Sequence, residues 1–311
     1  MHDSGITRLQ RVLNRDEFAV TSELGPPKHS GTEEFAATAR LLAPVVDAAN
    51  VTDNQTAQSR MSPLAAGRIA LDNGVEPVMQ LTVRDRNRLA LTSDLLGASA
   101  LGLHNTLAMS GDPIHIGNHP TATAVNDIDT LGLLRLQRAL RSGHFANDDD
   151  EPIRGIAPSL FIGATANPMA PDPDVEISKL RAKMEAGADF FQTQLCYEPA
   201  RVMAFLDRLR AAELPAWPRL LIGVGPFKHL RMAIHMRDKV WGVDVPVALI
   251  SRMETADDEG EEGKRICVEI IQQLREMDGV SGCHVMAVAW ERSVPEILVR
   301  AGLRTGAEPT T

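Results

Sequence analysis

A single glutamate follows a short apolar run near the start of the chain. Residues 18–20 (Phe-Ala-Val) have the apolar and β-branched character of a strand, and Glu23 comes shortly after them. The sequence Gly-Pro-Pro at 25–27 then stops regular structure. A strand that carries a carboxylate to its C-terminal end and then breaks is typical of a barrel enzyme that uses this group as an acid. Glu23 is therefore a candidate acid, and a solvated loop glutamate is the alternative interpretation.

Further polar side chains stand at the ends of the other apolar runs. They are Asp53, Asn54, Gln55, Gln80, Thr82, Asp112, Asn167, Gln192 and Gln194, and Phe227 follows a later run. If these runs are parallel strands of one barrel, the groups meet at one mouth. Carboxylates and amides suit a heteroaromatic ligand with a donor and acceptor edge, and Phe227 offers a plane for stacking. Burial among carboxylates would move the pKa of Glu23 from about 4.3 toward the range of about 6–7 that suits a general acid.

The apolar runs alternate with helical segments along the chain. We expect strands over 18–22, 45–51, 75–83, 100–109, 159–164, 189–195, 220–224 and 280–288. We expect helices over 3–13, 32–42, 63–73, 87–96, 128–142, 175–186, 199–212 and 294–301, with further helices and turns over 228–277. This repeat is typical of parallel βα architecture. It predicts an α/β fold, one (βα)8 TIM barrel with parallel strands, as a single catalytic domain over 1–311.

An open doubly wound sheet is the alternative fold. No GxGxxG sequence opens any of the expected helices, and a GxxxxGK[ST] phosphate loop is absent from the sequence. Both observations favour the closed barrel.

Composition argues against several classes of function. The net charge is −9 and the basic residues are scattered, which argues against nucleic-acid binding. No window approaches about 18 uninterrupted apolar residues, so we expect no membrane span. The N-terminal sequence lacks the apolar core of a signal peptide, so we expect a cytoplasmic protein. Nothing in the sequence decides the oligomeric state.

Thiol and metal chemistry find little support in the sequence. Cys196, Cys267 and Cys283 form no CxxC pair, and we expect reduced, buried thiols. His115 and His119 are four residues apart in a loop that contains glycine and proline, so this spacing does not place them on one helix face. We therefore predict no metal site. No GxSxG sequence or Cys/His pair indicates a covalent nucleophile.

Five segments resemble the catalytic domain of methylenetetrahydrofolate reductases. They are the strand that ends in Glu23 with its two prolines, Ser-Gly-Asp-Pro at 110–113, GATANP at 163–168, EAGADFFQTQLCYEP at 185–199, and Gly-Pro-Phe-Lys at 225–228. The resemblance extends over nearly the whole chain, and the segment around Gln194 is the most specific.

The resemblance implies a barrel that reduces methylenetetrahydrofolate to methyltetrahydrofolate. Glu23 matches the general acid of the family, which protonates the leaving nitrogen so that an iminium cation forms and accepts a hydride. Asp112 matches the aspartate that contacts the pterin and favours the cation. Gln194 matches the glutamine that binds the pterin, and Phe227 matches the aromatic residue that stacks on the aminobenzoyl ring.

The chain departs from the family in the loops that hold FAD. Members usually carry Thr-Tyr-Gly-Ala-Gly where residues 52–56 read Thr-Asp-Asn-Gln-Thr. Gln80 stands where a histidine is typical, and Ser110 stands where an arginine is usual. Residues 167–171 (Asn-Pro-Met-Ala-Pro) replace a Tyr-Pro-Glu-x-His-Pro loop. Small glycines that admit a flavin contact have thus become larger polar residues.

These departures lead to the hypothesis of direct hydride transfer from NADH or NADPH without bound FAD. The nicotinamide would lie near Gln80, Thr82, Ser110 and Asn167, in the position that the flavin ring takes in relatives. Asp53 would join Glu23 and Asp112 as a catalytic group, and Asn54, Gln55 and Gln192 would contact the substrate together with Gln194 and Phe227. The sequence does not choose between NADH and NADPH, because no Rossmann acidic residue is present to read.

Two other functions stay open at this point. One is a pterin-dependent methyltransferase on the same barrel, and the other is a non-catalytic folate-binding partner protein. The presence of Glu23 argues against both, since neither a methyl transfer from a reduced donor nor simple binding needs a ring-opening acid.

Overall fold

The strands of the computed structural model close into one barrel. The structure describes residues 5–147 and 149–305, so the ends of the expected 1–311 span and residue 148 lie outside the described residues. The strands are β1 (Ala19–Leu24), β2 (Ala48–Val51), β3 (Pro77–Thr82), β4 (Asn105–Met109), β5 (Phe161–Ala166), β6 (Phe190–Leu195), β7 (Leu220–Val224) and β8 (Gly282–Val285). Each strand pairs in parallel with the next, and β1 pairs with β8. The predicted α/β TIM barrel is confirmed.

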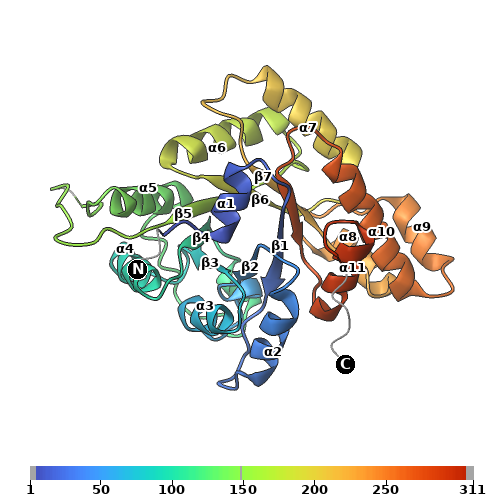
Figure 1. Cartoon of the computed structure of the whole chain (residues 1–311), viewed down its shortest axis with the longest axis horizontal. Coiled ribbons are helices and arrows are strands. Elements are labelled where there is room, and N and C mark those ends of the chain that lie inside the picture. Colours follow the sequence, from blue (N-terminus) through green and yellow to red (C-terminus); the bar gives the residue numbers. More distant parts are fainter. Residues whose placement is uncertain (1–4, 148, 306–311) are drawn as a thin grey trace.

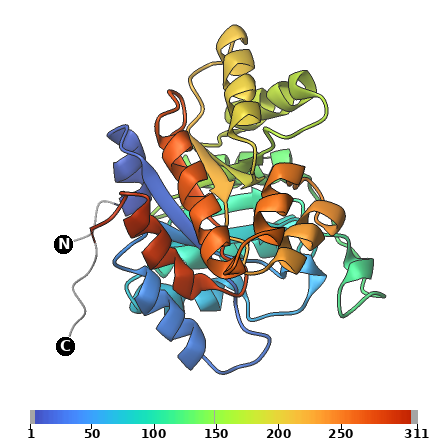
Figure 2. The same cartoon turned by 90° about the vertical axis from the view of Figure 1, so that its right-hand side faces the viewer.

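The helices surround the ring of strands (Figure 1). They are α1 (Arg8–Asn14), α2 (Glu33–Leu42), α3 (Pro63–Asp72), α4 (Arg88–Ala100), α5 (Thr130–Arg141), α6 (Pro173–Ala186), α7 (Pro199–Ala211), α8 (Leu230–Lys239), α9 (Val247–Glu254), α10 (Glu259–Arg275) and α11 (Val294–Arg300). Short 3-10 turns lie at η1 (Gln55–Ala57), η2 (Ile114–Ile116) and η3 (Glu291–Ser293). Figure 2 shows α8 to α11, in orange and red, packed together as one group beside the barrel.

Several expected strands are shorter in the structure than their apolar runs suggest, among them 75–83, which forms a strand only over Pro77–Thr82. Three further runs show why. The run 45–51 begins with a turn, because the amide of Val45 donates to the carbonyl of Leu42 at 2.9 Å. The run 100–109 begins inside α4, whose last residue is Ala100. The run 280–288 forms a strand only over Gly282–Val285. In each run, apolar residues that cover the barrel from a helix or turn adjoin those of the strand, and periodicity does not separate the two.

The amino end of the barrel is filled by apolar side chains. Leu9 and Leu13 of α1 are buried against one layer of strand residues, namely Ala19, Ala48, Val78, Leu107, Phe161, Phe190 and Leu221. The carboxylate of Glu76 accepts the first amides of α1, from Arg8 at 2.6 Å and from Leu9 at 3.0 Å. This acid satisfies the open N-terminal amides of the helix and fixes it across the barrel. The helix lies over the centre of the ring in Figure 1.

In the part of the chain that the structure describes, no helix has the length and apolarity to cross a bilayer.

Candidate active site

Four polar side chains meet on the barrel axis above the apolar layer. The hydroxyl of Thr21 forms a 2.9 Å hydrogen bond with Nδ1 of His284 and accepts one from Nε2 of Gln192 at 3.2 Å. Gln192 and Asn50 pair through their amides at 2.7 and 3.1 Å. Because β6 is not a neighbour of β1 or β2, these bonds cross the interior. The side chains of Thr21, Asn50, Gln192 and His284 therefore point inward.

The next inward position on three of these strands lies closer to the mouth. Alternate residues of a strand share one face, so Glu23, Thr52 and Gln194 also point into the barrel. Val78 belongs to the apolar layer below, and the same rule places Gln80 and Thr82 inside. The expected convergence of these strand-end groups on one mouth is thus present in the backbone geometry.

Asn50 and His284 were not identified from the sequence. Burial lowers the pKa of His284 to about 3, so the ring stays neutral at physiological pH. Gln192 was expected to contact substrate, but both ends of its amide are bonded within the barrel. A polar residue in the middle of an apolar strand was the available signal, since such a residue needs a buried partner.

Glu23 has an ionisable group without a bonded partner in the described part of the chain. Its side chain is half-buried, and among the described residues no hydrogen bond reaches its carboxylate. Burial raises the pKa of Glu23 to about 7, the charge of Glu291 adds to this effect, and the guanidinium of Arg60 opposes it. Arg60 is held by the carbonyl of Pro26 at 2.8 Å. Glu23 is therefore an acid that is still substantially protonated at neutral pH.

A cavity of about 240 Å³ adjoins the end of β1 and is lined by both Arg60 and Glu291. Neither residue was singled out from the sequence. Glu291 belongs to η3, which follows β8, the strand that pairs with β1. A carboxylate that follows the last barrel strand was the available signal, because the strand ends of a barrel meet at one face.

Replacement of Glu291 by glutamine is expected to lower the pKa of Glu23, because the like charge that disfavours its ionisation is removed. A general acid works only when protonated, so the high-pH limb of kcat/KM should move below its wild-type position near pH 7. At pH 8 the variant should be several-fold slower, while the rate at pH 6 should change little. A pH profile of kcat/KM measures this shift, and an unmoved limb would contradict the coupling.

One carboxylate oxygen of Asp53 is engaged in a network at the rim. Its Oδ2 accepts hydrogen bonds from the amide of Thr82 at 2.8 Å and from the Thr82 hydroxyl at 3.0 Å, and it pairs with Arg86. Burial raises the pKa of Asp53, and Arg86 and Thr82 act in the opposite direction. Arg86 also pairs with Asp94 at 2.8 Å. This arrangement positions the β3 end, and the catalytic role of Asp53 and the ligand contact of Thr82 stay predictions.

The loop after β2 has left-handed backbone at three residues other than glycine. Asn54, Thr56 and Ala57 have φ values of 47°, 54° and 53°. Asn54 donates to Asp85 at 3.2 Å and accepts from the amide of Arg60 at 3.0 Å. Positions 54 and 56 are those at which the resemblance implies glycine. The loop thus has a conformation that suits glycine, with side chains in place of the two glycines.

Replacement of Thr56 by glycine is expected to stabilise the protein by about 1 kcal/mol, because a β-branched residue is strained at this φ. Urea unfolding measures the change in free energy. As a matched control, Thr38→Gly within α2 should destabilise by about 0.5 kcal/mol, the difference between the helix propensities of threonine and glycine. A loss of stability in Thr56→Gly would show that the side chain compensates the backbone strain.

The amides of Gln80 and Gln55, which we also expect to bind a ligand, differ in the hydrogen bonds that they form within the protein. Gln80 is 7% exposed, and no hydrogen bond to its amide comes from the residues that the structure describes. The amide oxygen of Gln55 accepts a bond from Thr52, and its nitrogen lies near Gly25, where an added Cβ would be 3.3 Å away. A buried amide without a protein partner is suited to a ligand, which makes Gln80 the best placed of the group.

Four expected residues lie at the outer rim of the mouth. Ser110, Asp112 and Gln194 are exposed, and Asn167 is half-buried. Oδ2 of Asp112 accepts the amide of Thr56 at 2.7 Å, which joins the β4 and β2 loops. The side-chain oxygens of Gln194 and Asn167 bond to nearby amides at 2.9 and 3.0 Å, so their amide nitrogens are the groups available to a ligand.

Phe227 lies in the core and not at the mouth. It is 0% exposed, and its ring stacks on Tyr197 with centroids 4.5 Å apart and planes at 25°. Gly263 of α10 packs so closely that an added Cβ would lie 1.8 Å from the carbonyl oxygen of Phe227. The ring offers no exposed face for a ligand in this structure, and its stacking role stays a prediction. The structure buries it because the β7–α8 loop folds under α10.

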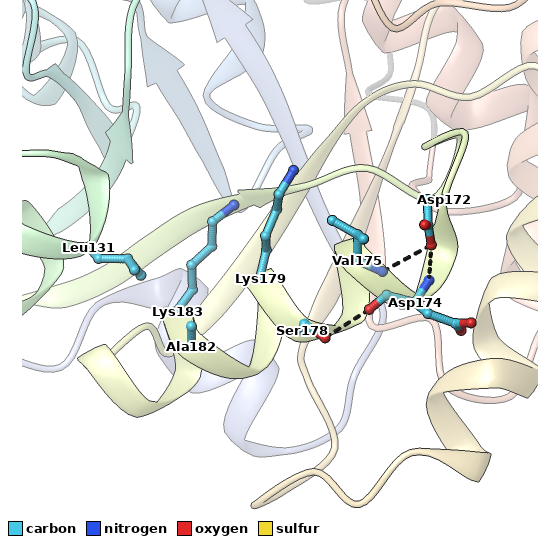
Figure 3. A pocket seen from close by; sticks show the side chains of 8 residues that line it. All are labelled: Leu131, Asp172, Asp174, Val175, Ser178, Lys179, Ala182 and Lys183. Atoms are coloured by element: carbon cyan, nitrogen blue, oxygen red, sulfur yellow. Dashed lines mark hydrogen bonds between the residues drawn. The ribbon is translucent and has the colours of Figure 1, made fainter.

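A larger cavity, of about 580 Å³, lies in the helical shell between α5 and α6 (Figure 3). Lys179 and Lys183 extend from the same side of α6. The ammonium of Lys183 donates to the carbonyl of Thr165 at 2.6 Å, and burial lowers its pKa. None of the expected site residues lines this cavity. Although this cavity is the larger of the two, its lining does not identify it as the active site. The carboxyl and amide groups at the barrel mouth remain the candidate site.

The thiols are buried, as expected. Burial raises the pKa of Cys196 to about 11 and that of Cys283 to about 12, and it also raises the pKa of Cys267. These thiols stay protonated and are poor nucleophiles at neutral pH. Within residues 5–147 and 149–305, no three His, Cys, Asp or Glu side chains form a group that could hold a metal ion.

Comparison with known proteins assigns this chain to a family. The family model for methylenetetrahydrofolate reductase matches residues 8–302. Methylenetetrahydrofolate reductase 1 of Schizosaccharomyces pombe is 30% identical over 258 residues, which are 79% of this chain and 39% of that protein. A probable methylenetetrahydrofolate reductase (NADPH) of Caenorhabditis elegans is 22% identical over 95% of this chain and 44% of that protein. The chain thus spans about two fifths of the length of these relatives.

Solved structures support the fold. A protein from Clostridium thermocellum, described as binding two copies of 5-methyl-5,6,7,8-tetrahydrofolic acid, superposes with a TM-score of 0.63 at 17% identity, over 94% of this chain and 96% of that one. Together, the barrel, the inward acid of its first strand and the match over residues 8–302 show that the chain belongs to the methylenetetrahydrofolate reductase family.

Proposed function

We propose that this protein reduces 5,10-methylenetetrahydrofolate to 5-methyltetrahydrofolate, with NADH or NADPH as the hydride donor and without bound FAD. The observation that carries the proposal is Glu23, an inward carboxyl group at the mouth with no bonded partner among the described residues and a pKa near 7. Family membership supplies the reaction class. The folate ligand of the Clostridium thermocellum protein is consistent with this substrate.

The proposed chemistry needs one proton and one hydride. Glu23 gives its proton to the nitrogen that leaves the methylene carbon, the carbon–nitrogen bond breaks, and an iminium cation forms on the folate. The methylene carbon then accepts a hydride, which yields the methyl product and the oxidised nicotinamide. Solvent returns a proton to Glu23. A group that is half protonated near neutral pH can both give and regain a proton in each cycle.

Residues at the rim would orient the two ligands. The free amide nitrogen of Gln194 would bond to the pterin, and the carboxylate of Asp112, at the β4 end, would stabilise the positive charge of the cation. Gln80 would bond to the carboxamide of the nicotinamide, because its own amide has no partner among the described residues. Ser110 and Asn167 follow the neighbouring strands β4 and β5 and would also contact the nicotinamide.

The loop after β2 supports the absence of FAD. Side chains occupy positions 54 and 56, where the resemblance implies glycines, and the backbone there still has positive φ. A Cβ at each position takes space that a glycine leaves for a close ligand contact. Asn54 is further bonded to Asp85 and Arg60, so this side chain does not simply swing away. These residues do not fit the flavin cradle of the family.

An absorbance spectrum of the native protein tests the cofactor, and nicotinamide oxidation in the same cuvette tests the reaction. We expect no flavin band, and we expect NADH or NADPH to be consumed only when methylenetetrahydrofolate is present. One equivalent of FAD per chain would refute the flavin-free mechanism. A colourless protein that consumes no nicotinamide would refute the reductase proposal.

A further inference from the structure

Trp241 is an aromatic side chain that the fold leaves in water. It is 89% exposed, in the loop between α8 and α9. By contrast, Trp217 is 40% exposed, donates to the carbonyl of Gly279 at 3.0 Å and lies against Arg210. Tryptophan carries a large apolar surface whose burial is favourable. An indole that is almost fully exposed to solvent therefore needs a functional explanation.

The loop that carries Trp241 is anchored on both sides. Val243 and Val245 are buried in the core. Arg201 pairs with Asp244 at 2.9 Å and donates to the carbonyl of Met169 at 2.9 Å, which ties the loop to α7 and to the segment after β5. The exposed position of the indole is thus set by a held backbone and not by a loose end.

This loop reaches the barrel mouth. Gly242 has a φ of +78°, and a Cβ at this residue would lie 3.9 Å from Cγ of Gln194 and 4.0 Å from Nδ2 of Asn167. The residue next to Trp241 therefore lies close to Asn167 and Gln194, at the ends of β5 and β6. Phe227, the expected stacking residue, is fully buried against Tyr197. A ligand ring that stacks at the mouth therefore needs another aromatic side chain.

We propose that Trp241 is the ligand-stacking residue of this site and that its indole covers one face of the aminobenzoyl ring of a folate. The assignment to folate rests on the proposed function, because Gln194, the expected pterin contact, is the side chain beside Gly242. Stacking of two aromatic rings adds affinity beyond the area that they bury. A nucleotide base offers the same flat surface, so the experiment includes both classes of ligand.

Fluorescence titration of the full chain tests the proposal. The chain has three tryptophans, and the double variant Trp217→Phe/Trp290→Phe leaves Trp241 as the only one. We expect p-aminobenzoylglutamate and 5-methyltetrahydrofolate to quench its emission with saturation, after correction for absorbed light with free tryptophan. Unsaturable quenching would overturn the proposal.

Isothermal titration of Trp241→Ala and Trp241→Phe measures the contribution to affinity. Trp241→Ala should raise the Kd for 5-methyltetrahydrofolate by about 5- to 10-fold, and Trp241→Phe should stay within about 3-fold, because a phenyl ring still stacks. The Kd for NADH and NADPH should not change, and Trp217→Phe should bind like the wild type. A loss of nucleotide affinity alone, or no loss for either ligand, would overturn the assignment.

The two proposals can fail separately. If folate binds through Trp241 but no nicotinamide is oxidised, the stacking stands and the proposed reaction fails. If Trp241→Ala binds 5-methyltetrahydrofolate with wild-type affinity and reduces methylenetetrahydrofolate with wild-type kinetics, the stacking proposal fails and the reaction stands. Because the indole is 89% exposed, the alanine variant is expected to fold normally.

Discussion

Replacement of Glu23 by glutamine is expected to lower kcat for methylenetetrahydrofolate reduction by about 10²–10⁴-fold, while the Kd for folate stays within a few-fold. The glutamine has the shape of the acid but gives no proton to the leaving nitrogen. The carboxylate of Glu23 makes no hydrogen bond within the described residues, so the substitution breaks no hydrogen bond among them. Steady-state kinetics with NADH and NADPH, together with calorimetric folate titration, separate the two effects.

Glu34→Gln is the matched control for this variant. Glu34 is exposed and lines the same 240 Å³ cavity, so its charge is removed from nearby without touching the acid. Its activity should stay within about 2-fold of the wild type, because a surface charge is well screened. If Glu23→Gln and the wild type both bind folate and neither consumes nicotinamide, the protein is a folate binder and not a reductase.

Replacement of Asp53 by alanine is expected to cost about 3 kcal/mol of folding free energy, because removal of one partner of a buried ion pair leaves the other charge uncompensated. Asp53 is 4% exposed and accepts from both the amide and the hydroxyl of Thr82 besides its pair with Arg86. We place the cost at the lower end of the usual range since Asp94 still pairs with Arg86. Urea unfolding gives the change in free energy.

Asp112→Ala is the control for this prediction, since Asp112 is exposed and accepts a single backbone amide at 2.7 Å. It should cost less than about 1.5 kcal/mol. A stable Asp53→Ala protein with lost activity would instead favour the catalytic role expected from the sequence. Asp53→Asn distinguishes further, because it keeps the size of the side chain and removes only the charge.

The barrel was predictable because it depends on a local pattern. Each strand end is marked by a change from apolar to polar residues, and the period of two along a strand assigns Glu23, Gln80 and Gln194 to one face. The order of the strands then follows from the preference of βα units for adjacent, parallel placement. The limits of several elements were wrong: α4 continues to Ala100 instead of ending at residue 96, and some strands are shorter where apolar turns or helices adjoin them.

The state of each side chain was not predictable, because it depends on partners from distant segments. Asp53 and Glu23 look alike in the sequence, yet Asp53 bonds to Arg86 and Thr82, whereas Glu23 is influenced by the charges of Glu291 and Arg60 without a hydrogen bond from the described residues. Similarly, Gln192 and Gln80 are both buried amides, but among residues 5–147 and 149–305 Gln192 has a partner across the barrel and Gln80 has none. Which amide is free to meet a ligand is a property of the packed interior and not of the strand that carries it.

The helix α1 closes the amino end of the barrel with Leu9 and Leu13, so ligands reach the interior from the opposite end. A hydride donor and a folate that react directly must therefore both enter from the carboxyl end of the barrel and be bound there at the same time. Initial rates measured against both concentrations should then give intersecting double-reciprocal lines, whereas a carrier reduced in a separate half-reaction would give parallel ones. Because both ligands enter from the same end of the barrel, the ligand that binds first restricts access for the second. An excess of one ligand should therefore slow the reaction.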